Sequence, residues 1–141
     1  MIDAPELVLD SSVALGWMFE DERDRYSEAV LRQLADSVAL VPWLWHCEVG
    51  NILRNAVIHA RISLAAATRA LDRAADLRIQ TVSLNENAGF WMSRALDFKL
   101  TSYDAQYLEL ALRRQLPLAT KDKELIAAAR SHGVRLWQPQ H

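Results

Sequence analysis

Short hydrophobic runs alternate with longer amphipathic segments along the chain. The short runs predict β-strands at residues 6–9, 38–41, 79–84, 116–120 and 134–137. Hydrophobic positions at helical spacing predict helices at residues 21–34, 43–60, 63–77, 85–96, 101–114 and 123–132. Ser11 and Ser12 begin a turn into a further helix. Alternation of strands and helices is typical of a parallel sheet. We therefore expect an α/β fold, a three-layer α/β/α sandwich around a central, mainly parallel sheet.

The composition is that of a globular protein. The 141 residues are 51% hydrophobic and 24% charged, which suffices for a buried core without disulfides or structural zinc. We expect a single domain spanning residues 1–141. The lone cysteine, Cys47, cannot form an internal disulfide and argues against a cysteine-based zinc site, which favours a reducing compartment.

The chain shows no targeting or membrane pattern. Its N-terminus, MIDAPELVLDSS, lacks the positive start and the apolar stretch of a signal peptide. No apolar run approaches the ~18–20 residues needed to span a bilayer. We therefore expect a cytoplasmic protein with no membrane partner.

The overall charge is a weak argument against a nucleic-acid partner. The net charge of −2 gives no overall electrostatic indication of one. Basic residues are nevertheless bunched at Arg113 and Arg114 and at Lys121 and Lys123. Each of them, taken singly, is equally compatible with an ordinary solvated helix face.

Four carboxylates lie at strand-to-helix junctions or on a helix just after a strand. They are Asp10, Glu48, Asp104 and Asp122. In an open α/β sheet such junctions converge at one edge, where ligands bind. Four acids gathered there would repel one another unless a hard cation joined them. The pattern therefore predicts a metal site and, with it, phosphate chemistry.

Helix capping is a simpler alternative for three of these acids. Asp10 and Asp122 each precede a predicted helix, and Asp104 lies three residues after Thr101, which is a capping-box spacing. Capping and metal binding can coexist at one residue. Glu48 has no such alternative, because it lies inside a predicted helix at the edge of its apolar face.

Together these segments resemble the PIN-domain ribonucleases, and in particular the VapC-type toxins of bacterial toxin–antitoxin pairs. The resemblance runs through LVLDSSVALGWMFEDE, VPWLWHCEVGNILRNA and TSYDAQYLELALRRQLPLATKDKELIAAA. The family's four acidic positions correspond to Asp10, Glu48, Asp104 and Asp122. Neighbouring positions that also match are Ser11, Asn51 and Thr120. Gly16 departs from the pattern, since many relatives carry a basic residue there; if that base holds substrate, RNA binding would be weakened or redirected here.

The resemblance implies an Mg²⁺-dependent endoribonuclease. Carboxylates suit Mg²⁺ or Mn²⁺, which would polarise the scissile phosphate and lower the pKa of a bound water. We expect Asp10 and Asp104 to be the most direct ligands, with Glu48 and Asp122 holding waters or a second metal. Residues expected to support these ligands are Ser11, Asn51 and Thr120. Residues expected to contact the RNA phosphates are Arg113, Arg114, Lys121 and Lys123.

The resemblance also implies protein partners. In the family, the first helices form a hydrophobic groove that a cognate antitoxin fills, and a homodimer places two active sites side by side. We expect Trp17, Met18 and Phe19, ahead of the acidic stretch EDERD, to form the partner surface.

Two other functions remain open. A phosphoaspartyl phosphatase or a receiver-like Mg²⁺-binding α/β domain would also carry an aspartate such as Asp10 after its first strand. However, the second acid that is usual two residues later is Ser12 here, and no Lys-Pro pair follows a late strand. The other alternative is a catalytically silent PIN domain that binds RNA or a protein partner.

Overall fold

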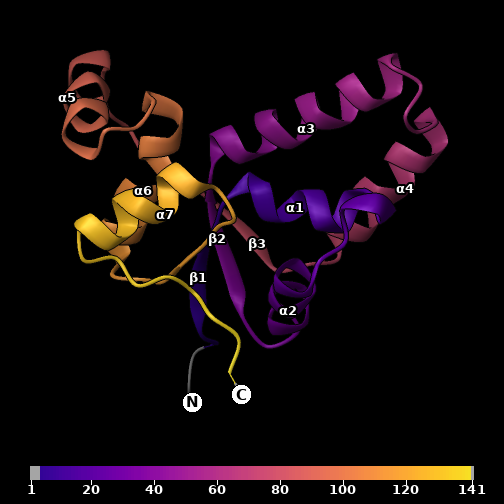
Figure 1. Cartoon of the computed structure of the whole chain (residues 1–141), viewed down its shortest axis with the longest axis horizontal. Coiled ribbons are helices and arrows are strands. Elements are labelled where there is room, and N and C mark those ends of the chain that lie inside the picture. The colour runs from indigo at the N-terminus through magenta and orange to yellow at the C-terminus, as the bar shows by residue number, and fades with distance from the viewer. Residues whose placement is uncertain (1–3, 141) are drawn as a thin grey trace.

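A computed structural model of the protein describes residues 4–140 (Figure 1). Within these residues, the strands are β1 (Glu6–Leu9), β2 (Val38–Pro42), β3 (Ile79–Val82) and β4 (Leu118–Ala119). The helices are α1 (Ser11–Met18), α2 (Arg25–Gln33), α3 (Trp43–Ile58), α4 (Leu64–Ala75), α5 (Ala88–Phe98), α6 (Ser102–Arg114) and α7 (Lys123–Ser131). A 3₁₀ turn, η1 (Glu20–Glu22), follows α1.

The strands form a parallel sheet in the order β3-β2-β1-β4. Val8 of β1 is in register with Leu40 of β2 on one side and Leu118 of β4 on the other. The last predicted strand, residues 134–137, is reduced to a single parallel bridge between Leu118 and Leu136. Since β4 is only two residues long, it offers little edge for a further strand to pair with.

Helices cover both faces of this sheet (Figure 1). The helices α1 to α4 lie on one face; α6 and α7 lie on the other, where α5 packs on α6. Right-handed crossovers explain why the helices divide between the two faces. The connections from β1 to β2 and from β2 to β3 run in one direction along the sheet, which places their helices on one face. The connection from β3 to β4 runs in the opposite direction, which places its helices on the other face. The predicted three-layer α/β/α sandwich is confirmed.

Side-chain caps fix where several helices begin. The helices α2 and α5 begin later than the hydrophobic pattern suggests, because a short polar side chain closes the first turn of each. Asp24 accepts a hydrogen bond from Ser27 N at 2.8 Å ahead of α2, and Asn87 accepts one from Phe90 N at 3.0 Å ahead of α5. The predicted cap of α4 is confirmed, since the Ser63 hydroxyl accepts a backbone hydrogen bond at 3.0 Å.

The core lies on both faces of the sheet. Its largest fully buried side chains include Leu7, Leu9, Leu40, Leu108, Leu110 and Leu118. Trp45 is buried as its helical position suggested, whereas Trp137 is half-buried and packs edge-to-face on Tyr26. Among the helices of residues 4–140, none is both long and apolar enough to cross a membrane.

Candidate active site

The sheet reverses its strand order between β1 and β4, and the acids gather at that point. β1 connects toward β2 and β3, while β4 lies on its other side. Ligands of open α/β folds bind in the crevice outside the carboxyl ends of strands at such a switch point. Asp10 directly follows β1, and its backbone N–H donates to Ala119 O of β4 at 3.0 Å. Thr120 directly follows β4, so both residues lie at the carboxyl ends of the two strands at this switch point.

Asp10 is a buried carboxylate whose orientation is fixed by hydroxyl groups. Its side chain is only 3% exposed. Its Oδ2 accepts hydrogen bonds from Ser12 Oγ at 2.6 Å and from Thr120 Oγ1 at 2.7 Å. The side chain makes no capping hydrogen bond to α1, so the capping alternative does not hold at this position.

Glu48 projects from α3 toward the same end of the sheet, beside Ser11. Its Oε1 accepts hydrogen bonds from Ser11 Oγ of α1, at 3.1 Å, and from the hydroxyl of Tyr107 on α6. The contact with Ser11 agrees with the supporting role expected from the sequence. Tyr107 was not predicted. Its position on the apolar face of a predicted helix indicated a core residue and gave no sign of a contact with an acid. Tyr107 is indeed fully buried.

Asp104 and Asp122 both stand in the first turn of a helix or just ahead of it. Thr101 caps α6, accepting from Asp104 N at 3.1 Å, and Asp122 caps α7, accepting from Leu125 N at 2.9 Å. Capping is therefore confirmed for Asp122, and Asp104 occupies the expected position in a capped turn. Carboxylate oxygens of Asp104, Asp122 and Glu124 also lie within 4.8 Å of one another.

Glu124 is an addition to the predicted set of acids. It follows Asp122 by two residues on α7, where an acid in the first turn is explained by the helix dipole alone. Its side chain is exposed, but it joins Asp104 and Asp122 because α6 and α7 begin beside each other. Asp10 and Glu48 stand outside this closest group of described residues.

Burial and mutual repulsion raise the pKa values of Asp10, Glu48 and Asp104 and so disfavour their charged forms. Burial raises the pKa of Asp10 against the opposing hydrogen bonds of Ser12 and Thr120. Burial likewise raises the pKa of Glu48, opposed by the hydroxyls that hold it. The pKa of Asp104 is raised to about 6, first by burial and then by the neighbouring charges, which are those of Asp10, Asp122, Glu48 and Glu124. Bound positive charge would relieve this repulsion.

The donor set fits a hard divalent cation. Three of the acids each use one oxygen to contact the protein, namely Asp10 Oδ2, Glu48 Oε1 and Asp122 Oδ1. Within residues 4–140 the second oxygen of each, and both oxygens of Asp104, accept no hydrogen bond from the protein. Carboxylates held on one side and free on the other are suited to Mg²⁺ or Mn²⁺ and the waters that such ions retain. The residues that could hold the ion are Asp10, Glu48, Asp104, Asp122 and Glu124.

The remaining predicted site residues are not all brought together. Asn51 is exposed one turn after Glu48 and makes no hydrogen bond to the four predicted acids in the described part of the chain. Arg113 and Arg114 lie at the far end of α6 from Asp104, about 13 Å away by helical rise. Arg113 is bound there by the carboxylates of Glu86, at 2.8 Å, and Glu109, at 2.6 Å.

The two predicted lysines differ in their surroundings. Lys121 and Lys123 flank Asp122 at the start of α7. The ammonium group of Lys121 forms an ion pair of 2.7 Å with Asp24 at the start of α2, while Lys123 is exposed. Lys123 is therefore better placed than Lys121 to meet a phosphate.

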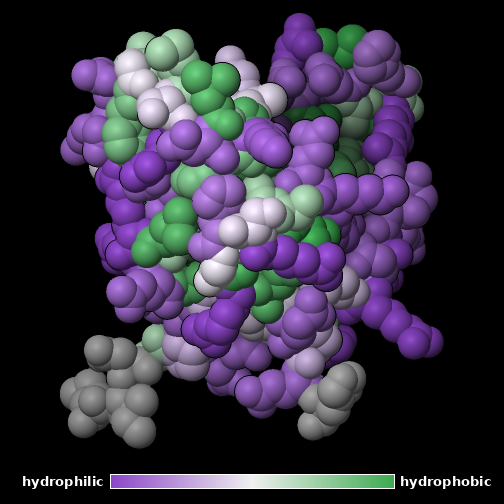
Figure 2. Space-filling view, turned by 60° about the vertical axis from the view of Figure 1, so that its left-hand side comes forward, coloured by the Kyte–Doolittle hydropathy of each residue, from purple (hydrophilic) through white to green (hydrophobic). Residues whose placement is uncertain are grey.

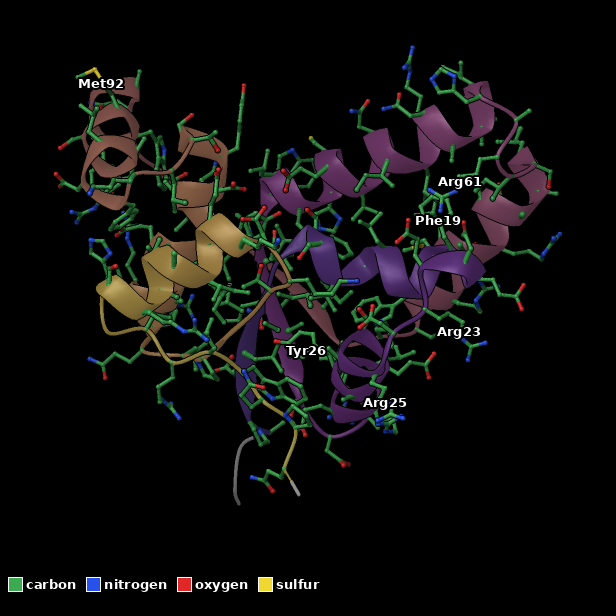
Figure 3. All side chains as sticks on the ribbon, in the orientation of Figure 1. Phe19, Arg23, Arg25, Tyr26, Arg61 and Met92 are labelled. Atoms are coloured by element: carbon green, nitrogen blue, oxygen red, sulfur yellow. The ribbon has the colours of Figure 1, made fainter. Side chains whose placement is uncertain are left out.

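The expected partner surface lies beside a separate groove. Trp17, Met18 and Phe19 line a hollow of about 800 Å³ between α1, η1, α2 and α4. Met18 and Phe19 are themselves 8% and 2% exposed, so they form the floor of the groove. Arg61 reaches from beyond the end of α3 to Phe19, with its guanidinium carbon 4.0 Å from the ring centroid (Figure 3). Trp17 is held by a hydrogen bond from its Nε1 to Ser27 O at 2.8 Å.

Comparison with known proteins agrees with this fold. Residues 7–131 match the PIN domain, and the chain belongs to the PIN-domain family. It is similar to Ribonuclease VapC1 of Mycobacterium tuberculosis, with 37% identity over 103 residues, which are 72% of this chain and 77% of that protein.

Solved structures share the same architecture. A protein from Pyrobaculum aerophilum superposes with a TM-score of 0.66 at 24% identity, covering 88% of this chain and 79% of that one. VapBC2 from Rickettsia felis, bound to a DNA fragment from its promoter, gives a TM-score of 0.65 at 11% identity, covering 94% and 97%. A toxin–antitoxin complex from Klebsiella pneumoniae gives 0.63 at 13% identity, covering 96% and 98%. At these identities the likeness extends to the fold alone.

Proposed function

We propose that this protein is an endoribonuclease that requires Mg²⁺ or Mn²⁺ and acts in the cytoplasm as the toxin of a toxin–antitoxin pair. The observation that carries the proposal is the set of carboxylates at the β1/β4 switch point, with Asp104, Asp122 and Glu124 oxygens within 4.8 Å of one another. The chain's membership of the PIN family and its 37% identity to a ribonuclease support the same activity. A phosphoaspartyl phosphatase or receiver-like domain receives no such support.

The chain's own residues would hold the ion and orient the RNA. Asp10, Asp104 and Asp122 offer free oxygens to the cation, and Glu48 is poised to hold a coordinated water or a second ion. Bound Mg²⁺ or Mn²⁺ would polarise the scissile phosphate and lower the pKa of water for attack. Because the site is acidic, phosphates need nearby positive charge, which Lys123 at the start of α7 can supply.

RNA cleavage with matched variants tests the activity. We expect the purified protein to cleave RNA with Mg²⁺ or Mn²⁺, and EDTA to abolish cleavage. Asp10→Asn and Asp104→Asn should each lose activity while remaining folded, whereas Asp72→Asn, an exposed acid on α4, should cleave as the wild type does. Full cleavage by both site variants would contradict the proposal. Metal binding without cleavage of any RNA would favour the catalytically silent alternative.

We further propose that the groove beside Trp17, Met18 and Phe19 binds the antitoxin. Its floor is apolar, and Arg69 and Arg73 on its wall form no ion pair within residues 4–140. A partner segment with apolar and acidic side chains would complement this surface. One chain of the VapBC2 complex and one chain of the Klebsiella complex share the fold of this chain, which supports a protein partner.

Filling the groove tests this partner. The candidate partner would be a small protein encoded directly upstream, co-expressed with this chain. We expect the two to copurify and cleavage to be suppressed. Ala66→Trp should block copurification by filling the groove. It should leave RNA cleavage intact, because the groove is not lined by any of the acids proposed to hold the metal. Unchanged copurification would show that the partner binds elsewhere.

A homodimer is also proposed, through the outer face of α5. Met92 and Leu96 are 63% and 71% exposed, and Tyr103 at the start of α6 is 61% exposed. They line a hollow of about 590 Å³ with no charged residue in its wall. Figure 3 shows Met92 pointing away from the rest of the protein, and Figure 2 shows hydrophobic surface in the upper left, where α5 lies. An uncharged apolar patch can pack on a second copy of itself without like-charge repulsion.

Light scattering after size exclusion measures this association. Leu96→Glu should convert a dimer to a monomer, because it buries a charge in the interface. Asp97→Lys, on the same helix but outside the hollow, should leave the dimer intact. A dimer that survives Leu96→Glu would place the interface on another face.

A further inference from the structure

Tyr107 on α6 contacts Glu48 on α3 and is not itself one of the acids proposed to hold the metal. It lies on α6, is fully buried, and donates its hydroxyl hydrogen to Glu48 Oε1 on α3, 59 residues away in the chain. Ser11 on α1 donates to the same oxygen at 3.1 Å. We propose that Tyr107, with Ser11, is a positioning residue that fixes the Glu48 carboxylate so that its second oxygen faces the metal. The proposal rests on the proposed metal-dependent function.

Two donors on one oxygen remove most of the freedom of a flexible side chain. A glutamate has three rotatable side-chain bonds, and Glu48 is only half-buried, so packing alone does not fix its carboxylate. Hydrogen bonds to a charged acceptor are short and strong, and two of them on Oε1 define the carboxylate plane. Oε2 accepts no hydrogen bond from the described residues and remains available to the ion or its waters.

Tyr107 is suited to this role because it remains a donor. A phenol is neutral at pH 7, so its hydroxyl carries the hydrogen that Glu48 Oε1 accepts. Its ring is enclosed in the core, so the hydroxyl cannot turn away to solvent. Ser11, which is 9% exposed, completes the pair from the opposite helix layer.

One face of α6 serves two acids of the site. Asp104 and Tyr107 are three residues apart on this helix and therefore lie on the same face. The helix presents one carboxylate directly and orients a second through the phenol. Any shift of α6 would change both acids together, which makes α6 the element that sets the geometry of the site.

A plain structural role for the hydroxyl predicts a different result. A hydrogen bond that only satisfies buried polar groups would change stability and leave metal binding unchanged. A positioning role requires that metal affinity fall, and that the fall depend on Glu48. Mn²⁺ titration calorimetry without RNA separates the two, because it does not require nuclease activity.

The test is a double-mutant cycle on Mn²⁺ affinity. Tyr107→Phe keeps the ring and removes the hydroxyl; we expect Mn²⁺ affinity to fall about 10-fold, as is typical when a ligand loses its supporting contact. Ser11→Ala should act in the same direction from the other side. In the Glu48→Gln background, Tyr107→Phe should cause no further loss.

A control variant separates loss of metal affinity from the general effect of removing a hydroxyl group. Thr68→Val removes another side-chain hydroxyl hydrogen bond, to Leu64 O at 2.9 Å within α4, and should leave Mn²⁺ affinity unchanged. Unchanged affinity in both Tyr107→Phe and Ser11→Ala would overturn the inference, and so would an equal loss in the Glu48→Gln background. If Tyr107→Phe does not fold, Ser11→Ala and its cycle with Glu48→Gln decide alone. Absence of RNA cleavage with these Mn²⁺ results intact would overturn the proposed function and leave the positioning role standing.

Discussion

Thr120 donates a hydrogen bond of 2.7 Å to Asp10 Oδ2 across 110 residues of sequence. The same hydroxyl oxygen accepts the backbone N–H of Asp122 at 3.0 Å. One side chain at the end of β4 therefore fixes the orientation of the acid that follows β1 and the backbone of the acid that begins α7. Because β1 and β4 are paired neighbours, the sheet itself brings these groups together.

Thr120→Val should weaken both the fold and the site. Valine has nearly the same shape but can neither donate to Asp10 nor accept from Asp122. Leaving buried polar groups without partners costs about 1–3 kcal/mol. Urea denaturation should show that loss, and Mn²⁺ titration should show weaker binding. Thr120→Ser, which keeps the hydroxyl, should retain Mn²⁺ affinity; equal behaviour of the two variants would contradict the role of the hydroxyl.

The stability of the metal-free protein should fall as the pH rises from 4 to 7. The pKa of Asp104 is about 6 in the folded protein, against about 3.9 for an unfolded aspartate. Folding therefore favours the protonated form, whose contribution is complete below about pH 4 and is lost as the pH passes through 6. Asp10 and Glu48, whose pKa values are also raised, act in the same direction.

Denaturant midpoints in EDTA measure this dependence. Asp104→Asn should raise the midpoint at pH 7 and flatten the decline between pH 4 and 7. Added Mn²⁺ should restore stability at pH 7 in the wild type, because the ion binds the deprotonated acids of the folded state. A wild-type midpoint that rises with pH in EDTA would show that repulsion among the acids is not a dominant cost.

Glu109→Gln should loosen the packing of α5 on α6. Glu109 is buried on α6 and lies 2.6 Å from Arg113 Nε; its other oxygen lies 2.7 Å from Arg94 Nε on α5, a close ion pair without hydrogen-bond alignment. Breaking a fully buried pair costs about 3–5 kcal/mol, and roughly 2 is expected here because both arginines are partly exposed. Chemical denaturation gives the value. Glu86→Gln, at the exposed end of the network, should cost less than about 1 kcal/mol.

Gly16→Ala should destabilise the protein although alanine favours helices. A Cβ at Gly16 would lie 2.5 Å from Ser27 Cβ, where α1 meets α2. Overpacking of this kind costs about 1–3 kcal/mol. Gly50→Ala is the matched control, because a Cβ there meets nothing within 4 Å and should stabilise α3 by about 0.8–1 kcal/mol. Equal effects in urea denaturation would refute the close packing at Gly16.

The close packing at Gly16 also explains why this chain has glycine where many members of the resembling family carry a basic residue. Any side chain here would have to displace Ser27 and Asp24, which approach α1 closely. Asp24 in turn holds Lys121 at 2.7 Å. The glycine is therefore accounted for by helix packing in this chain. Its effect on RNA binding remains a prediction.

Local chemistry in the sequence was sufficient for most of the helices and strands and for singling out four candidate acids, whose role in metal binding remains a prediction. Hydrophobic periodicity located the helices and the parallel strands, because burial selects side chains at fixed spacing. Ser63 and Thr101 were recognisable as caps, because capping depends on the residue and its next few neighbours. The weakest prediction, the strand at 134–137, fails for a related reason: a strand exists only if a partner edge is long enough, and β4 is not.

Only the tertiary structure decided which groups meet. Glu124 joins the acids because α6 and α7 begin side by side, and Tyr107 reaches Glu48 because α6 crosses the sheet opposite α3. The same packing places Arg113 far from the site and beside Glu109. The sequence by itself determined the kinds of side chain and their order along the strands, since those follow from local burial and charge. Contacts between distant segments depend on strand order and helix packing, which no local pattern specifies.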